Sequence, residues 1–378
     1  MTWTFPMPML SSPTPEPELR PGFAGEPKWD GFRALLSVDG GRVALRSRRG
    51  TEMGPAFPEV VAGAGQLPDA TALDGELIVW DAAGRLAFER LQNRLSRRGA
   101  KATAGAQQWP AHFVAFDVLR LSGTDTASWP YRRRRGALEA LFTDRALTAP
   151  WALCPSTTDP DTLRDYLTWT AVGLEGVVFK RLDAPYRPSV RGWQKYKIRE
   201  TSEAIVGAFT GPRAAPRTLL LGRYDTEDRL QYAGRTTTLP RSAATALADL
   251  LPADQADHPW TGWSFSAGWD SHETLAVTLV KPELVVEVGV DVARDASGRW
   301  RHPARWHRPR PDIASKLVFY PLSVSYGGDG RFQTSSNLLM IWRSSRAVRG
   351  DTACVTVSRR TRASRGLPQQ YQCTLPHS

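Results

Sequence analysis

The sequence predicts an α+β protein in which a domain of antiparallel sheets with helices is followed by a smaller β-barrel. Between residues 28 and 201, strand-like segments joined by turns alternate with two segments of helical spacing. After about residue 201 the segments become shorter and mostly β, with one helix among them. With 378 residues, the chain is long enough for two domains that each bury a core.

The first domain is expected to span residues 28–201. Asp39-Gly40-Gly41 lies between two apolar alternating segments and is typical of a β-hairpin turn. Strands are predicted at Phe32–Val38, Arg42–Arg46, Ala72–Trp80, His112–Leu119, Gly176–Lys180 and Trp193–Ile198, and helices at Phe88–Arg97 and Tyr131–Phe142. Residues 1–27 are rich in proline, which predicts an extended lead-in instead of a helix.

The second domain is expected to span residues 202–314. Strands are predicted at Ala204–Phe209, Thr218–Tyr224, Leu230–Ala233 and Leu284–Val292, with a helix at Ser242–Leu251. About five short strands with one helix suit a small oligonucleotide-binding (OB) barrel. Residues 315–378 lose this order, and we expect a basic, disordered tail there. A frameshifted, non-native C-terminus is the alternative that the sequence leaves open.

The net charge of +11 predicts a polyanionic partner. Residues 313–378 hold one lysine, eight arginines, two aspartates and no glutamate, a net +7, which leaves +4 for the remainder. The three cysteines form no CxxC pair, which argues against a zinc site or a disulfide framework. The chain has no signal-peptide pattern and no apolar stretch of the roughly 20 residues that span a bilayer. We therefore expect a cytoplasmic protein without membrane contact.

The most informative motif is Lys28-Trp-Asp30-Gly31-Phe-Arg33. A lysine amine can attack a nucleotide α-phosphate if its proton is removed and the phosphate charge is neutralised. A lysine with the usual pKa near 10.4 is about one part in 1,000 neutral at pH 7.4, so deprotonation costs roughly 4 kcal/mol. We expect a bound divalent cation and neighbouring cationic side chains to offset that cost.

Five further blocks follow in a fixed order. They are Ser47-Arg48-Arg49-Gly50, Leu73-Asp74-Gly75-Glu76-Leu77, Phe113-Val-Ala-Phe116-Asp117, Glu175-Gly176-Val-Val-Phe-Lys180 and Trp193-Gln-Lys195-Tyr-Lys197. The joint pattern resembles the signature set of the covalent nucleotidyltransferase superfamily, which holds DNA ligases, RNA ligases and mRNA capping enzymes. Within it, the chain is most similar to small bacterial ATP-dependent DNA ligases, in particular the actinobacterial ligase C type. The resemblance runs from about Gly22 to Asp312.

The resemblance implies a nucleotidyltransferase (adenylation) domain followed by an OB-fold domain, and it assigns roles to residues. Lys28 would be the adenylated nucleophile, with Asp30, Lys195 and Lys197 as further catalytic residues. Nucleotide binding would fall to Glu26, Arg33, Arg48, Glu76, Phe116 and Lys180, with Arg33 and Glu76 at the ribose, Phe116 stacked on adenine, and Arg48 and Lys180 at phosphate. Glu175, and also Glu76, would hold the metal. A plain core residue is the alternative for Phe116.

Strand periodicity adds geometry to these roles. Lys195 and Lys197 lie two residues apart and share a face, which suits a clamp on one α-phosphate. Glu175 and Lys180 would lie on opposite faces, unless a turn at Gly176 shifts the alternation.

A last block runs from Arg301 to Asp312 and resembles the motif whose basic residues orient the leaving pyrophosphate. We assign that role to Arg308 and Arg310. Ile313 stands where many members have lysine, and an arginine-rich loop facing nucleic acid is the alternative for this block.

These observations predict an ATP-dependent DNA ligase that seals 5′-phosphate/3′-hydroxyl nicks through a lysyl-adenylate and a DNA-adenylate. Its co-substrate would be ATP, its metal Mg²⁺ or Mn²⁺, and its substrate nicked duplex DNA. The resemblance suggests DNA repair alongside primase-polymerase proteins. An RNA ligase or a capping-type enzyme shares the first step and stays an alternative. An inert nucleic-acid-binding protein is a further alternative, of a different class.

Overall fold

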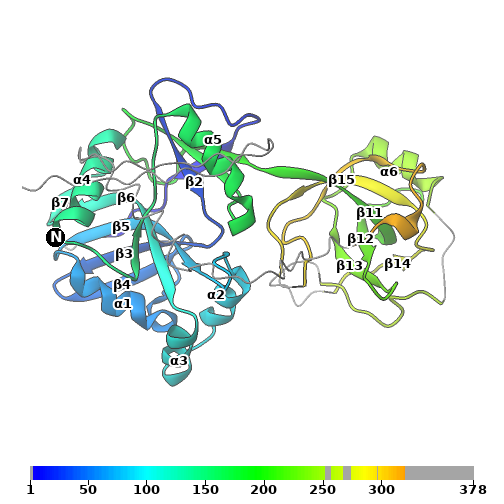
Figure 1. Cartoon of the computed structure of the whole chain (residues 1–378), viewed down its shortest axis with the longest axis horizontal. Helices are drawn as coiled ribbons and strands as arrows, with labels where there is room; N and C mark the ends of the chain where they lie inside the picture. The colour runs from blue at the N-terminus through cyan, green and yellow to red at the C-terminus, as the bar shows by residue number, and fades with distance from the viewer. Residues whose placement is uncertain (1–2, 252–256, 267–273, 296, 320–378) are drawn as a thin grey trace, which may run out of the picture.

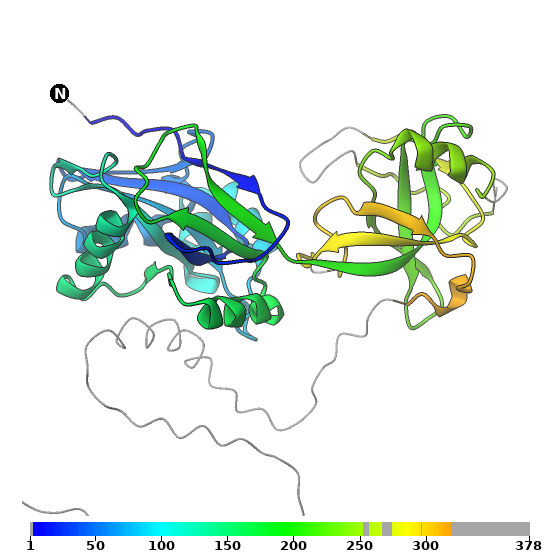
Figure 2. The ribbon, with the colours of Figure 1, turned by 90° about the horizontal axis from the view of Figure 1, so that it is seen from above.

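The computed structural model describes residues 3–251, 257–266, 274–295 and 297–319. Figures 1 and 2 show two lobes, and the chain passes from the first to the second along β11 (Arg199–Thr210). The predicted domain boundary near residue 201 falls within this strand and stays a prediction. The predicted tail lies outside the described residues from residue 320 onward. Within the described residues, no helix is long and apolar enough to cross a membrane.

The first lobe contains two sheets. The larger has the strand order β4-β3-β5-β6-β7, with β8 paired to β6, and the smaller has the order β1-β10-β9-β2. The larger sheet consists of β3 (Phe32–Asp39), β4 (Arg42–Ser47), β5 (Thr71–Val79), β6 (Ala111–Leu121), β7 (Thr124–Asp125) and β8 (Trp151–Leu153). Gly40 and Gly41 both have positive φ, as the predicted hairpin turn between β3 and β4 requires.

The smaller sheet corrects the prediction for residues 1–27. It consists of β1 (Leu10–Pro13), β2 (Phe23–Lys28), β9 (Gly176–Arg181) and β10 (Arg191–Lys197), so the expected lead-in supplies two of its four strands. Both of these strands lie at the edges of the sheet. Edge strands tolerate proline because one side of the backbone needs no ladder hydrogen bonds.

Helices pack on both sheets. The helices of this lobe are α1 (Pro58–Gly63), α2 (Phe88–Leu95), α3 (Ala100–Gln108), α4 (Tyr131–Asp144) and α5 (Pro160–Thr168), with 3-10 turns at Gly54–Ala56, Ala64–Gln66 and Trp169–Val172. Of these, α1, α2 and α4 contact the larger sheet, and α5 contacts β2 and β9 of the smaller one. Helix α5 was not predicted, although its cap is readable: the Asp159 side chain accepts a hydrogen bond from the Thr162 backbone N–H.

The second lobe is an OB-type barrel whose strands follow the order β13-β12-β11-β15-β16, with β14 paired to β11. These are β12 (Thr218–Tyr224), β13 (Leu230–Arg235), β14 (Thr278–Leu279), β15 (Val285–Asp291) and β16 (Arg305–Pro309), with α6 (Arg241–Ala248) and a 3-10 turn at Ser315–Leu317. Strand β11 pairs with β12, β14 and β15, so one long strand contributes to both sides of the barrel. Trp260 covers the barrel where Gly207 and Gly222 leave room for its ring.

Candidate active site

Lys28 is the last residue of β2, and the turn after it is shaped by Gly31. A Cβ atom at Gly31 would lie 2.1 Å from the Leu77 carbonyl oxygen, so only glycine lets this turn lie directly on β5. The buried Trp29 packs edge-to-face on Trp80 and anchors the turn from the other side. The sequence around Lys28 therefore fixes the lysine against the larger sheet.

Glu175 is the partner of Lys28. Its carboxylate forms an ion pair with the Lys28 ammonium, and its backbone N–H donates to the Lys28 carbonyl oxygen at 3.0 Å. Gly176, the first residue of β9, has φ +147°, which interrupts the alternation of side chains between Glu175 and the rest of the strand. Glu175 consequently faces the same side as Lys28 and Lys180, which was the exception left open by the sequence.

The charges of this pair stabilise each other. Burial alone would lower the pKa of Lys28, but the Glu175 carboxylate more than offsets it, and the net pKa is raised. Burial alone would raise the pKa of Glu175, but Lys28 and Lys197 lower it to about 2. The raised pKa favours the protonated, non-nucleophilic form of Lys28, and a cation that competed for Glu175 would lower that pKa.

Three further cations lie around this pair. Lys197 Nζ is 3.5 Å from Glu175 and 2.7 Å from Asp291 on β15. Burial lowers the pKa of Lys195, and the charges of Lys28, Lys197 and Arg48 lower it further, so these cations lie close together. Lys195 makes no ion pair with any residue that the structure describes.

The carboxylates present suit a hard divalent cation. The Oε1 atom of Glu175 is buried and has no hydrogen-bond partner among the described residues. Glu76 lies beside Lys28 and Asp30, and burial raises its pKa to about 8. Oxygen ligands of this kind fit Mg²⁺ or Mn²⁺. No cluster of three or more acidic, histidine or cysteine ligands occurs in the described part of the chain, so substrate phosphates and water would complete the shell.

The raised pKa of Glu76 predicts a pH-dependent stability. The folded protein holds this proton to about pH 8, whereas an unperturbed carboxyl releases it near pH 4.5. Wild-type stability should therefore fall as the pH rises between these values, and Glu76→Gln should lack this fall. Melting temperatures of both proteins in metal-free buffer at pH 5.5, 7 and 8 measure it. We expect the melting temperature of Glu76→Gln, relative to that of the wild type, to rise with pH. A difference in melting temperature that is the same at all three pH values would contradict the raised pKa of Glu76.

The aromatic part of the site lies around Phe116. This half-buried side chain packs edge-to-face on Trp193, with ring centroids 5.8 Å apart. Lys180 is buried beside it: its Nζ lies 4.7 Å from the Phe116 centroid, donates to the Phe116 carbonyl at 2.8 Å and pairs with Glu26 at 2.8 Å. Lys180 is thus held beside Phe116 within the protein, at a position where we expected it to contact phosphate. Glu26 supports Lys180, because both of its oxygens are bound within the protein.

Arg33 is engaged within the protein in this structure. Its guanidinium donates to Asp74 twice, at 3.0 and 2.6 Å, and to the Met9 carbonyl at 2.5 Å. Burial alone would lower the pKa of Arg33, but Asp74 raises it. The Arg33 guanidinium carbon lies 4.9 Å from the Trp193 ring centroid and 5.6 Å from the Phe116 centroid. Arg33 is thus fixed beside the aromatic part of the site.

Arg308 and Arg310 are engaged within the barrel. Arg308 pairs with Glu287 at 2.9 Å, and Arg310 pairs with Glu203, Glu287 and Asp312. Neither arginine contacts Lys28 among the described residues in this arrangement, and their assignment to the leaving pyrophosphate stays a prediction. Ile313 packs against the outer apolar cluster that contains Val318, which accounts for an apolar residue where lysine is common.

Two other residues of the same block reach the site instead. Arg301 donates to Asp30 in an ion pair, and its guanidinium lies 3.3 Å from the Phe88 ring centroid. His302 Nδ1 lies 3.5 Å from Asp291 and 4.0 Å from Glu175. The basic character of the block was readable from the sequence. Which of its cations touches the first domain depends on the loop before β16, which has no sequence signal.

Two family models match the chain. The ATP dependent DNA ligase domain matches residues 8–198, and the ATP dependent DNA ligase C terminal region matches residues 213–313. The chain belongs to the ATP-dependent DNA ligases. This confirms the family and the fold class expected from the motifs.

The ligase is similar to curated relatives over most of its length. It is 36% identical over 327 residues to DNA ligase C2 of Mycolicibacterium smegmatis, covering 81% of this chain and 90% of that protein. It is 33% identical over 298 residues to the multifunctional non-homologous end joining DNA repair protein LigD of Mycobacterium tuberculosis, covering 77% of this chain and 36% of that protein. A Lig E DNA ligase structure shares the fold, with a TM-score of 0.53 at 18% identity over 81% of this chain and 100% of that one.

Proposed function

We propose that this ligase seals 5′-phosphate/3′-hydroxyl nicks in DNA through an adenylate on Lys28. The observation that carries the proposal is the Lys28–Glu175 pair, flanked by Lys195 and Lys197 and placed beside the aromatic end at Phe116. In this proposal Lys28 is the nucleophile, Glu175 the metal-binding carboxylate, Lys195 and Lys197 the phosphate-binding cations and Phe116 the base-stacking ring.

Three displacements at phosphorus follow. Lys28 Nζ attacks the α-phosphorus of ATP, so that a P–N bond forms, the bond to pyrophosphate breaks and the lysine loses its proton. The AMP group then passes to the 5′-phosphate of the nick, which frees the lysine. Finally the 3′-hydroxyl attacks the activated 5′-phosphate, AMP leaves and the strand is closed.

The residues divide this work by charge. Glu175 and Glu76 would hold the divalent cation, which supplies Lewis-acid stabilisation of the phosphate charge when bound. Lys195 and Lys197 would clamp the α-phosphate, with Arg48 as a further phosphate contact. Phe116 would stack on adenine, and Lys180 would donate to the base.

Arg308 and Arg310 enter this scheme through domain motion. Their proposed role at the leaving pyrophosphate requires the barrel to turn towards the nucleotide and to release Arg301 from Asp30. The barrel would then return to grip the duplex, which is the second part of the cycle expected from the resemblance.

The proposal extends to the setting of the reaction. We place the ligase in the cytoplasm as a monomer that acts at the nucleoid in DNA repair, alongside primase-polymerase proteins. The support is the family resemblance and the similarity to a protein that is described as a multifunctional non-homologous end joining DNA repair protein.

A nick-sealing assay distinguishes a DNA ligase from an RNA ligase and from an inert nucleic-acid-binding protein. Purified protein with ATP and Mg²⁺ or Mn²⁺ is given matched duplexes that carry one nick in an all-DNA strand or in an all-RNA strand. We expect the DNA nick to be closed in preference to the RNA nick. Closure of the RNA nick alone would replace the proposal with an RNA ligase, and closure of neither would favour an inert binder.

A further inference from the structure

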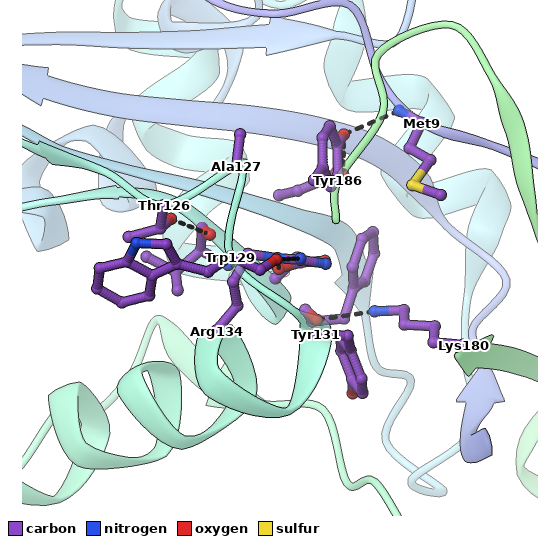
Figure 3. A network of polar contacts seen from close by, with 12 residues as sticks. Met9, Thr126, Ala127, Trp129, Tyr131, Arg134, Lys180 and Tyr186 are labelled. Carbon is purple, nitrogen blue, oxygen red and sulfur yellow. Dashed lines mark hydrogen bonds and ion pairs between the residues drawn. The ribbon is translucent and has the colours of Figure 1, made fainter. Parts of the chain in front are cut away.

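The buried polar network around helix α4 has a direct connection to the base-binding end of the site. Figure 3 shows Lys180 reaching from β9 towards Tyr131, the first residue of α4. The Tyr131 hydroxyl donates to Glu26 and lies 3.1 Å from the Ser156 hydroxyl. Glu26 in turn pairs with Lys180, so a chain of contacts runs from the helix to the ammonium beside Phe116.

The backbone places Tyr131 independently of its hydroxyl. The Tyr131 N–H donates to the Ala184 carbonyl and the Arg132 N–H donates to the Leu182 carbonyl, each at 2.9 Å. The start of α4 is therefore attached to the segment that follows Lys180. Arg134 strengthens the attachment with a fully buried, two-point ion pair to Asp117, the neighbour of Phe116. Removal of the hydroxyl alone should leave this frame in place.

The ammonium of Lys180 has one donor to spare. A lysine ammonium has three N–H donors. Two of those on Lys180 bind the Phe116 carbonyl and Glu26, which leaves one donor. Its Nζ also lies over the Trp193 and Phe116 rings, 4.5 Å and 4.7 Å from their centroids, so the ammonium is held beside the ring assigned to stacking. A fixed donor beside a stacked base would distinguish adenine from guanine, because the two bases exchange donor and acceptor groups around their six-membered rings.

We propose that Tyr131 is a positioning residue for nucleotide selection: its hydroxyl fixes Glu26, and Glu26 fixes the Lys180 ammonium beside the Phe116 ring. This inference rests on the proposed adenylation of Lys28. Tyr131 itself touches no nucleotide. Burial raises the pKa of its hydroxyl well above the usual value, so the hydroxyl remains a donor throughout the working pH range.

Tyr131→Phe tests the proposal, because it removes one oxygen and keeps the ring. Single-turnover labelling of the full chain is followed against ATP and against GTP concentration. The variant loses a hydrogen bond to the charged Glu26, which holds the residue proposed to contact the base. We expect this loss to reduce kcat/KM for ATP about tenfold, by raising KM. The rate at saturating ATP and the slow rate with GTP should stay within about twofold, so the ATP:GTP preference narrows.

Tyr186→Phe is the matched control. Tyr186 is also buried, and its hydroxyl donates to a carboxylate, Asp74, at 2.7 Å while it accepts from the Met9 N–H (Figure 3). Asp74 holds Arg33, which we assign to the ribose that ATP and GTP share, so this variant should lose similar stability, change kcat/KM for ATP and GTP equally and leave the ATP:GTP preference unchanged. In a Glu26→Gln background, Tyr131→Phe should change the preference less than twofold, because the link to Lys180 is already altered.

The outcomes separate cleanly. Three results would overturn the role of Tyr131. They are an equal loss of kcat/KM for ATP and GTP, a fall in the rate at saturating ATP with KM unchanged, and a narrowed ATP:GTP preference in Tyr186→Phe as well. A wild-type protein that takes no label from ATP would overturn the proposed function, and this inference with it. We expect Tyr131→Phe to narrow the ATP:GTP preference when Glu26 is present, and to leave that preference unchanged in the Glu26→Gln background.

Discussion

Lys28→Ala is expected to abolish ATP-dependent nick sealing and to spare the sealing of a nick that already carries AMP on its 5′-phosphate. The first step needs the lysine nitrogen as nucleophile, and loss of a nucleophile costs at least about 10⁴-fold in comparable enzymes. The last step needs the 3′-hydroxyl instead. Since Glu175 keeps Lys197 as a partner in the variant, the site should remain folded.

The measurement is gel-based ligation of a plain nick with ATP and of a pre-adenylated nick without ATP. Lys281→Ala is a suitable control, because Lys281 is an exposed lysine whose partner is Glu283. ATP-dependent sealing that survives in Lys28→Ala would require a different nucleophile. A variant that melts as the wild type does and fails equally on both substrates would contradict a role confined to AMP transfer.

Glu175→Gln has the second largest expected effect, and its sign separates two roles. If Glu175 served only to hold Lys28, its neutralisation would lower the raised pKa of Lys28 and speed the attack. If it holds the metal, self-adenylylation should fall by at least about 100-fold, and half-saturation should move to higher Mg²⁺ concentration. The buried, unpartnered Oε1 atom leads us to expect the second result.

Initial rates of self-adenylylation across a Mg²⁺ series measure this effect. Glu227→Gln is the matched control, because Glu227 is an exposed glutamate whose arginine partner is Arg229 on the same turn. A variant that labels itself faster than the wild type, or with the same Mg²⁺ dependence, would exclude Glu175 as a metal ligand.

Much of this site was readable because its residues lie on regular strands. Apolar alternation predicted β3, β5, β6, β9 and β10, and these strands carry the nucleotide-binding blocks. Strands β1 and β2 were missed because proline argues against strand structure, and a sequence does not reveal that a strand lies at an edge.

Individual side-chain contacts could be predicted from the sequence less well than helices and strands. Gly176 reverses the side to which Glu175 points through one backbone angle, which strand periodicity does not include. Arg33 lies opposite Glu76 in the sheet, yet its side chain turns to Asp74 because that buried carboxylate offers a two-point bond. In the block from Arg301 to Asp312, the choice of Arg301 as the contact to Asp30 depends on a loop outside any periodic element.

The most direct test of the account is the identity of the covalent intermediate. Adenylate-free protein is incubated with α-³²P-labelled ATP or GTP and a divalent cation, denatured and digested, and the labelled peptide is identified. We predict acid-labile label from ATP alone, on the peptide that contains Lys28. Label from GTP in place of ATP, label on another residue, or no label on adenylate-free protein would contradict the central claim.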